Sequence, residues 1–151
     1  MLNLTKSETV TKYFGIPAMS LPETIVKEKD NRPPVAIGHV RLYVSNVLEA
    51  SDFFVKIGLR SIAQSEQLAV LELRGGTHLV LRTSSDTIEA GINAPFDLMV
   101  DDVSATRDTF RKWGLTVSEI ETGRIHSSFT LTGPDDYLLT LTSSHTGGRE
   151  V

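Results

Sequence analysis

The chain has 151 residues, of which 40% are hydrophobic and 23% are charged, and its formal net charge at pH 7 is −4. This composition suits a globular protein with its own core, and the negative charge argues against nucleic-acid binding, which needs a basic surface. The lack of cysteine excludes disulfides, zinc–thiolate sites and cysteine nucleophiles. No apolar run approaches the roughly 20 residues of a membrane span, and no signal peptide is recognisable. We therefore expect a cytoplasmic protein without nucleic-acid or membrane partners.

Residues 1–35 are predicted to form an N-terminal arm. Two capping-box spacings predict short helices over about 6–14 and 21–28. Two interpretations of the arm stay open: a partly ordered terminus, as chain ends commonly are, or a segment that packs on the domain or on a partner subunit through Tyr13 and Phe14.

From residue 36 the chain repeats itself. Residues 44–59 align with residues 100–115 without a gap, and seven of the 16 aligned positions are identical. Each copy has the pattern of a strand, an N-cap residue (Asn46 or Asp102), a helix and a glycine that ends the helix. Such repeats are a strong guide to the fold.

Three strand-like runs follow each predicted helix. They lie at about 59–64, 68–74 and 77–83 in the first copy and at about 115–120, 126–132 and 137–143 in the second. The repeated unit is therefore βαβββ, and the fold class is α+β. We predict four segments: an arm (1–35), a first module (36–92), a second module (93–145) and a flexible tail (146–151).

A tandem βαβββ unit resembles the vicinal oxygen chelate superfamily, which includes glyoxalase I, extradiol dioxygenases, fosfomycin-resistance enzymes and bleomycin-binding proteins. The stretches that carry the resemblance are GHVRLYVSNVLEASDFF, which opens the first module, and TGPDDYLLTL, which closes the second. The second stretch is similar to the superfamily's DPDGxxxEL ending. The resemblance covers residues 36–143. It implies modules that curl into an open half-barrel, with helices outside and concave faces enclosing the site.

The resemblance also implies four metal ligands, one from the first and one from the last strand of each module. When each ligand position is transferred separately to this sequence, the four positions fall on His39, Val80, Pro95 and Thr140. Valine and proline have no side-chain donor, and threonine is a poor ligand for the divalent ions involved. We therefore expect no intact four-ligand site in this chain and no cofactor.

Strand alternation assigns further side chains to the concave face. In residues 39–44 the apolar positions should pack on the helix, which leaves His39, Arg41 and Tyr43 inside. The same reasoning applies to the other strands. The predicted ligand-binding residues are His39, Arg41, Tyr43, His78, Arg82, Asp97, His126 and Thr140.

The histidines of this face allow two interpretations. Each is either a hydrogen-bonded structural group or a ligand. A relocated metal site would combine His39 and His78 with either Glu72 or His126, and this donor set suits Zn, Ni, Fe or Mn.

The arginines Arg41 and Arg82 allow three interpretations, because an unpaired buried charge costs several kcal/mol. They are solvated, paired with a carboxylate, or paired with a ligand anion, which a guanidinium binds in bidentate fashion. The carboxylates in question are Glu72 and Asp97.

Other conspicuous residues have structural interpretations. The acidic pairs Asp101-Asp102 and Asp135-Asp136 stand in predicted turns, where caps and Asx turns are expected. Phe110 and Trp113 fall on the apolar stripe of the second helix and are predicted to lie in the core. No hydrolase elbow or nucleotide-binding loop occurs in the sequence.

Two biochemical functions follow from the resemblance. The first is a metal-independent protein that binds a small polar or anionic organic molecule. The alternative is a metal-dependent lyase, isomerase or dioxygenase-like enzyme, with His39 as a ligand and Glu72 or His78 as ligand or general base. Superfamily members commonly pair modules within or between chains, so a homodimer is also expected.

Overall fold

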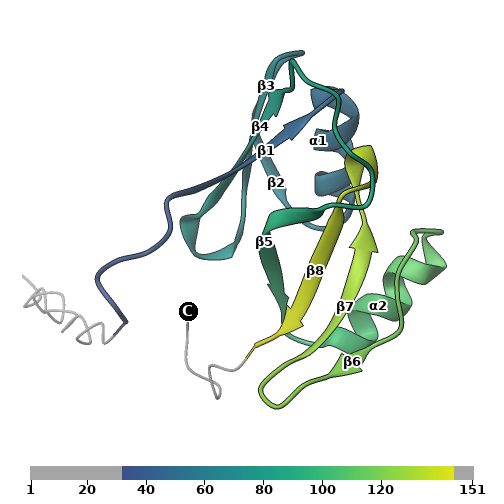
Figure 1. Ribbon diagram of the computed structural model, residues 1–151. Helices are drawn as coiled ribbons and strands as arrows, with labels where there is room; N and C mark the ends of the chain where they lie inside the picture. Colours follow the sequence, from purple (N-terminus) through teal and green to yellow (C-terminus); the bar gives the residue numbers. More distant parts are fainter. Residues whose placement is uncertain (1–31, 145–151) are drawn as a thin grey trace, which may run out of the picture. The chain divides into compact units, whose positions relative to one another are not determined.

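The computed structural model describes residues 32–144 (Figure 1). The chain divides into two compact units, Met1–Asn31 and Arg32–Val151, and all described residues belong to the second. The helices predicted near the N-terminus and the predicted C-terminal tail lie outside the described residues, and the division into four segments stays a prediction. No helix in the described part is long and apolar enough to cross a membrane.

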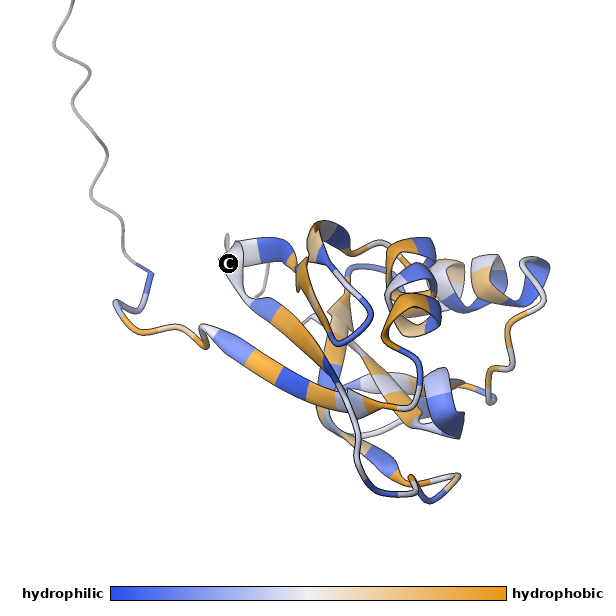
Figure 2. Ribbon diagram, turned by 90° about the horizontal axis from the view of Figure 1, so that it is seen from above, coloured by the Kyte–Doolittle hydropathy of each residue, from blue (hydrophilic) through white to orange (hydrophobic). Residues whose placement is uncertain are grey.

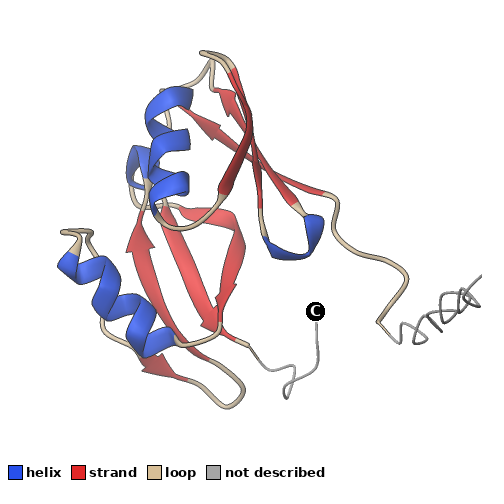
Figure 3. Cartoon of the chain, turned by 180° about the vertical axis from the view of Figure 1, so that it is seen from behind, coloured by secondary structure: helices blue, strands red, loops and turns tan. Residues whose placement is uncertain are grey.

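Residues 32–144 fold as two βαβββ modules, which confirms the predicted fold class (Figures 1 and 3). The first module consists of β1 (His39–Val44), α1 (Val47–Lys56), β2 (Arg60–Gln64), β3 (Leu68–Glu72), the 3₁₀ turn η1 (Arg74–Gly76) and β4 (His78–Thr83). The second consists of β5 (Asn93–Val100), α2 (Val103–Lys112), β6 (Glu121–Thr122), β7 (Ser127–Thr132), the 3₁₀ turn η2 (Pro134–Asp136) and β8 (Leu138–Ser143).

Each module forms one four-stranded mixed sheet, with strand orders β1-β4-β3-β2 and β5-β8-β7-β6. The first and last strands of a module pair in parallel, and the hairpins between the later strands are antiparallel. Arg41 stands opposite Val80 in the first sheet, and Asp97 stands opposite Thr140 in the second. These equivalent pairs confirm the internal alignment of the two copies.

The helices begin and end as the sequence predicts. The side chains of Asn46 and Asp102 accept hydrogen bonds from the N–H groups of Glu49 (3.2 Å) and Ala105 (2.8 Å). After each helix a glycine, Gly58 in the first module, adopts a positive φ (120°) that side chains disfavour. Each helix then packs on one face of its own sheet.

The helix-facing side chains of both modules join in one hydrophobic core, whose fully buried members include Leu42, Phe54, Leu71, Leu81, Phe129 and Leu141. Phe110 belongs to this core, as predicted. The prediction for Trp113 is wrong, because its side chain is 46% exposed. Trp113 is the C-cap residue of α2, so it stands past the end of the stripe that packs on the sheet.

The prediction of a strand over 115–120 is also wrong. This segment runs beside β7 through an isolated bridge between Val117 and Leu131, and the short strand β6 comes after it. The ladder is interrupted because the buried Arg107 donates its Nε–H to the carbonyl oxygen of Ser118, at 2.5 Å. The N–H of Thr130 then bonds to the Ser118 hydroxyl instead of the carbonyl.

The β5 strand departs from its counterpart β1 at Pro95. Asn93 pairs with Leu138 and Asp97 pairs with Thr140, so the register shifts between these two pairs. Proline has no N–H for the ladder and is accommodated at bulges and edges, and β5 is an edge strand. The bulge places Pro95 outside the regular register that His39 occupies in β1.

The two modules exchange equivalent contacts. Arg74 of η1 donates to both carboxylate oxygens of Asp101, at 2.9 and 3.1 Å. Ser45 donates its N–H (2.8 Å) and its hydroxyl to Asp135 of η2. Asp101 and Ser45 each directly precede the N-cap residue of a helix. The 3₁₀ turn of each module therefore holds the start of the other module's helix.

The role of Arg107 can be measured by replacing it with methionine, which keeps the apolar stem. Its guanidinium bonds to Ser118 and to Glu119 (2.6 Å) while the side chain is nearly buried. Because the Ser118 carbonyl loses its donor, we expect Arg107→Met to lower the free energy of unfolding by about 1–3 kcal/mol in urea titrations. Arg111→Met, at an exposed position of the same helix, is the control. Equal losses in both variants would contradict this account.

Candidate functional site

The first module has a polar face on the side of its sheet away from α1. Along β1 the side chains of His39, Arg41 and Tyr43 are exposed, whereas Leu42 and Val44 are buried. Figure 2 shows this alternation of hydrophilic and hydrophobic residues along the strand. The alternation predicted from the sequence is therefore present. We use the name polar face for His39, Arg41, Tyr43, Val70, Glu72, His78, Val80 and Arg82.

One cross-strand row of the polar face carries three ionisable groups. His39 pairs with His78, His78 with Glu72, and Glu72 with Arg60 of β2. The two imidazole rings stack with centroids 5.6 Å apart and planes inclined by 27°. Glu72 forms an ion pair with Arg60, so its carboxylate is already neutralised.

The next two cross-strand rows carry the two predicted arginines. Arg41 stands opposite Val80, and Arg82 stands opposite Tyr43. The two arginines are thus diagonal neighbours on paired parallel strands. Within residues 32–144 neither forms an ion pair or a hydrogen bond. Neither arginine is paired with Glu72, which is bound to Arg60, and both arginine side chains are exposed to solvent.

Three predicted site residues belong to the second module. Asp97 stands opposite Thr140 on the side of the sheet that corresponds to the polar face. His126 precedes β7, and its Nδ1 lies 3.0 Å from the carbonyl oxygen of Ser143. This contact gives His126 a structural hydrogen bond. The structure thus brings five predicted residues together in the first module and leaves these three on the second.

The residues at the four superfamily ligand positions do not fit a metal ion. Only His39 has an imidazole or carboxylate, and Pro95 lies in the β5 bulge. Within the described ranges no three histidine, aspartate or glutamate side chains are grouped as a metal site. In the grouping of His39, His78 and Glu72, the Glu72 carboxylate is bound to Arg60.

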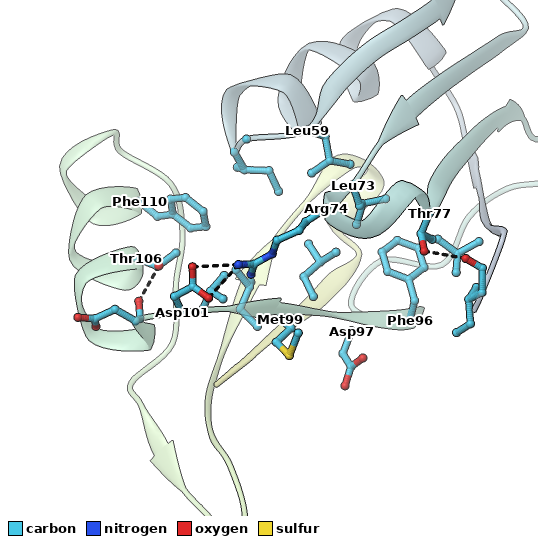
Figure 4. A pocket seen from close by; sticks show the side chains of 18 of the residues that line it. Leu59, Leu73, Arg74, Thr77, Phe96, Asp97, Met99, Asp101, Thr106 and Phe110 are labelled. Carbon is cyan, nitrogen blue, oxygen red and sulfur yellow. Dashed lines mark hydrogen bonds and ion pairs between the residues drawn. The ribbon is translucent and has the colours of Figure 1, made fainter. Parts of the chain in front are cut away.

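Sequence reasoning missed a cavity of about 980 Å³ between the modules (Figure 4). Its walls include Leu59 and Leu73 of the first module and Phe96 and Phe110 of the second. Of the predicted site residues, Asp97 alone borders this cavity. A sequence signal existed in the apolar residues around η1, but apolar residues at module ends are equally expected in a core.

A smaller cavity of about 490 Å³ adjoins the connection between β4 and β5. It is lined by Tyr43, by Tyr137 and by residues 83–89 and 92. Burial raises the pKa of the Tyr137 phenol, and the nearby carboxylate of Asp135 raises it further. Its hydroxyl is therefore held protonated, as an uncharged group.

Comparison with solved structures identifies the fold. A lactoylglutathione lyase from Agrobacterium tumefaciens matches with a TM-score of 0.63 and 20% identity, over 78% of this chain and 100% of that chain. A glyoxalase/bleomycin resistance protein/dioxygenase from Alicyclobacillus acidocaldarius matches with a TM-score of 0.61 and 20% identity, over 77% and 96%. The chain has the vicinal oxygen chelate fold. The resemblance seen in the sequence is thus confirmed at the level of the fold.

A third matching structure is described as a binding protein. TnmS3, an antibiotic-binding protein from a Streptomyces species, has a TM-score of 0.63 and 21% identity, over 74% of this chain and 98% of that chain. No protein-family model matches the sequence, and a search of curated proteins gives no match. At these identities the vicinal oxygen chelate fold is shared, and function must be argued from the site.

The raised pKa of Tyr137 predicts a loss of stability in alkaline solution. As the pH rises above about 10, the unfolded chain loses this proton before the folded chain does. Stability that is fully present below pH 10 is therefore lost as the pH passes through the raised pKa. We expect Tyr137→Phe to show a smaller fall in unfolding free energy between pH 9 and pH 11 than the unmodified protein. Tyr43→Phe is the matched control, and identical slopes in all three proteins would refute the assignment.

Proposed function

We propose that this chain is a metal-independent protein of the vicinal oxygen chelate superfamily that binds a small organic anion on the polar face. The observation that carries the proposal is the pair Arg41 and Arg82. Both guanidinium groups are on one face of paired strands, and neither has a carboxylate partner within residues 32–144. The one acidic side chain of the polar face, Glu72 of β3, forms an ion pair with Arg60.

The surroundings of the arginines suit a molecule with an apolar body and an anionic group. A guanidinium binds a carboxylate or phosphate through two parallel hydrogen bonds. Val80 and Val70 stand opposite each other in the middle of the face and offer an apolar floor. Tyr43 and the stacked His39–His78 pair add hydrogen-bonding groups and ring surfaces at its edges.

The comparisons give this proposal a precedent. One protein with the same fold and nearly full-length coverage is described as antibiotic-binding. Binding of a small organic molecule is therefore a known use of the fold, although the likeness is one of fold alone. A homodimer and a cytoplasmic location, both expected from the sequence, remain part of the proposal.

The anion site can be tested with 4-phenylbutyrate, which joins an aromatic body to a carboxylate. We expect it to shift the amide NMR signals of β1 and β4, whereas the uncharged 4-phenylbutanol should not. Arg41→Ala and Arg82→Ala should each weaken its binding about 10-fold or more, because each removes a charge-assisted hydrogen bond of about 1.5–3 kcal/mol. Arg124→Ala, at an exposed position before β7, is the control.

Two results would contradict the anion site. One is unchanged affinity for 4-phenylbutyrate in both the Arg41 and Arg82 variants. The other is an equal loss in the Arg124 variant, which would indicate attraction by net charge alone and no defined site.

The second candidate is a metal-dependent lyase, isomerase or dioxygenase-like enzyme, favoured by the stacking of His39 on His78. Two imidazoles on neighbouring strands are the beginning of a ligand set for Zn, Ni, Fe or Mn. Such a metal site would require Glu72 to break its ion pair with Arg60 and to join the two histidines. The choice between the two candidates therefore depends on bound metal.

Elemental analysis of protein purified without a histidine tag separates the two candidates. We expect less than 0.1 metal ion per chain, and no change in the NMR signals of β1 and β4 when ZnCl₂ or NiCl₂ is added. Stoichiometric metal that is lost in His39→Ala but retained in His126→Ala would overturn the metal-independent proposal.

A further inference from the structure

The internal repeat makes two equivalent junctions between the modules, and one of them is tightly closed. There α1 meets the turn η2, and Phe53 lies beside Gly133. A methyl group at Gly133 would lie only 2.8 Å from Leu139 and 3.6 Å from Phe53. A side chain at Gly133 would require Leu139 to shift, because the neighbouring side chains fill the space.

The second junction, where α2 meets the turn η1, is open. The alignment of the copies places Thr109 at the position of Phe53, and Leu73 at the position of Gly133. The Thr109 hydroxyl bonds to the carbonyl oxygen of Ala105 in its own helix, at 2.8 Å. Threonine is much smaller than phenylalanine and does not reach across to η1. The cavity of about 980 Å³ lies at this junction.

The walls of the cavity are apolar and come from both modules. Leu59 and Leu73 line one side, and Phe96 and Phe110 line the other (Figure 4). Phe96 follows Pro95 in the irregular part of β5 and, by the alternation of the strand, lies on the same face as the buried Leu98. It supplies an aromatic wall of the cavity.

The charged groups that line the cavity are one arginine, Arg74, and three aspartates, Asp97, Asp101 and Asp102. Arg74 and Asp101 form an ion pair across it, and Asp102 caps α2 through the N–H of Ala105. Figure 4 shows Asp97 pointing away from Arg74. An anionic ligand would therefore find no free cationic side chain among these walls, whereas a hydroxyl or carbonyl group could bond to the exposed ion pair.

We propose that this inter-module cavity is a second binding site, which takes an uncharged and largely apolar organic molecule. Its volume lies within the roughly 300–1,000 Å³ of small-molecule pockets, and such pockets combine apolar walls with a few polar groups. This site is separate from the polar face and binds the opposite class of molecule. The proposal therefore does not depend on the anion site.

Trp113 provides a direct measurement of occupancy. It is the single tryptophan of the chain, and its ring lies 5.7 Å from that of Phe110, which lines the cavity. We would titrate Trp113 fluorescence with three probes that share one body: 4-phenylbutanol, 4-phenylbutyrate and 4-phenylbutylamine. The uncharged alcohol should give a saturable change, and the two charged probes should bind at least fivefold more weakly at this site.

Variants locate the binding. Thr106 lines the cavity, and Thr106→Phe should fill it and weaken 4-phenylbutanol binding at least 10-fold. Ser104→Phe, at an exposed position of the same helix, adds the same side chain and should leave binding unchanged. Phe96→Ala removes an aromatic wall of the cavity and should also weaken 4-phenylbutanol binding. This second variant tests the site if the Thr106→Phe protein does not fold.

Several outcomes would overturn the proposal. These are no saturable response to 4-phenylbutanol, tighter binding of either charged probe, or full affinity in Thr106→Phe and Phe96→Ala. If affinity falls as the protein concentration rises and sedimentation shows a dimer, a second copy of the chain covers the cavity instead. Arg41→Ala and Arg82→Ala should leave the alcohol's affinity unchanged, so failure of one site is distinguishable from failure of the other.

Discussion

The parallel pairing of the first and last strands of each module, in one fixed register, determines both the core and the site. Side chains on a strand alternate between its two faces, so a shift of one residue would exchange every buried and exposed group. In the first module this register buries Leu42 and Leu81 while it exposes Arg41 and Arg82. The arginines are therefore positioned by the same hydrophobic packing that stabilises the sheet.

The two modules share this framework but differ in chemistry. Arg41 of the first module corresponds to Asp97 of the second, and Val80 corresponds to Thr140. Burial of the helix-facing side chains maintains the framework. The side chains of the opposite face can therefore differ without loss of the fold. This freedom explains how a chain can have the vicinal oxygen chelate fold although the residues at the positions of the superfamily's metal ligands do not suit a metal.

Most of the fold could be predicted from the sequence, because it rests on local signals that the repeat presents twice. The caps Asn46 and Asp102, the glycine stops and the alternating strands are all short-range patterns. The failures involve interactions that join distant segments. Arg107 diverts the carbonyl of Ser118 and interrupts a strand, and no local pattern indicates that a helix residue will do so.

The candidate site was predictable in part, for the same reason. Alternation alone placed His39, Arg41 and Tyr43 on one face. The ion pair between Arg60 and Glu72 depends on the register of β2 against β3, which the sequence does not define. The inter-module cavity was not predictable, because it lies at a junction that only the assembled modules form.

The exchange of turns between the modules has a consequence for how the protein unfolds. Arg74 of the first module secures the start of α2, and Asp135 of the second secures the start of α1. Neither half can open without releasing a helix end in the other half, and the hydrophobic core is shared by both. The shared core and the exchanged contacts therefore favour unfolding of the repeat as one cooperative unit, in contrast to the independent domains that a duplicated sequence suggests.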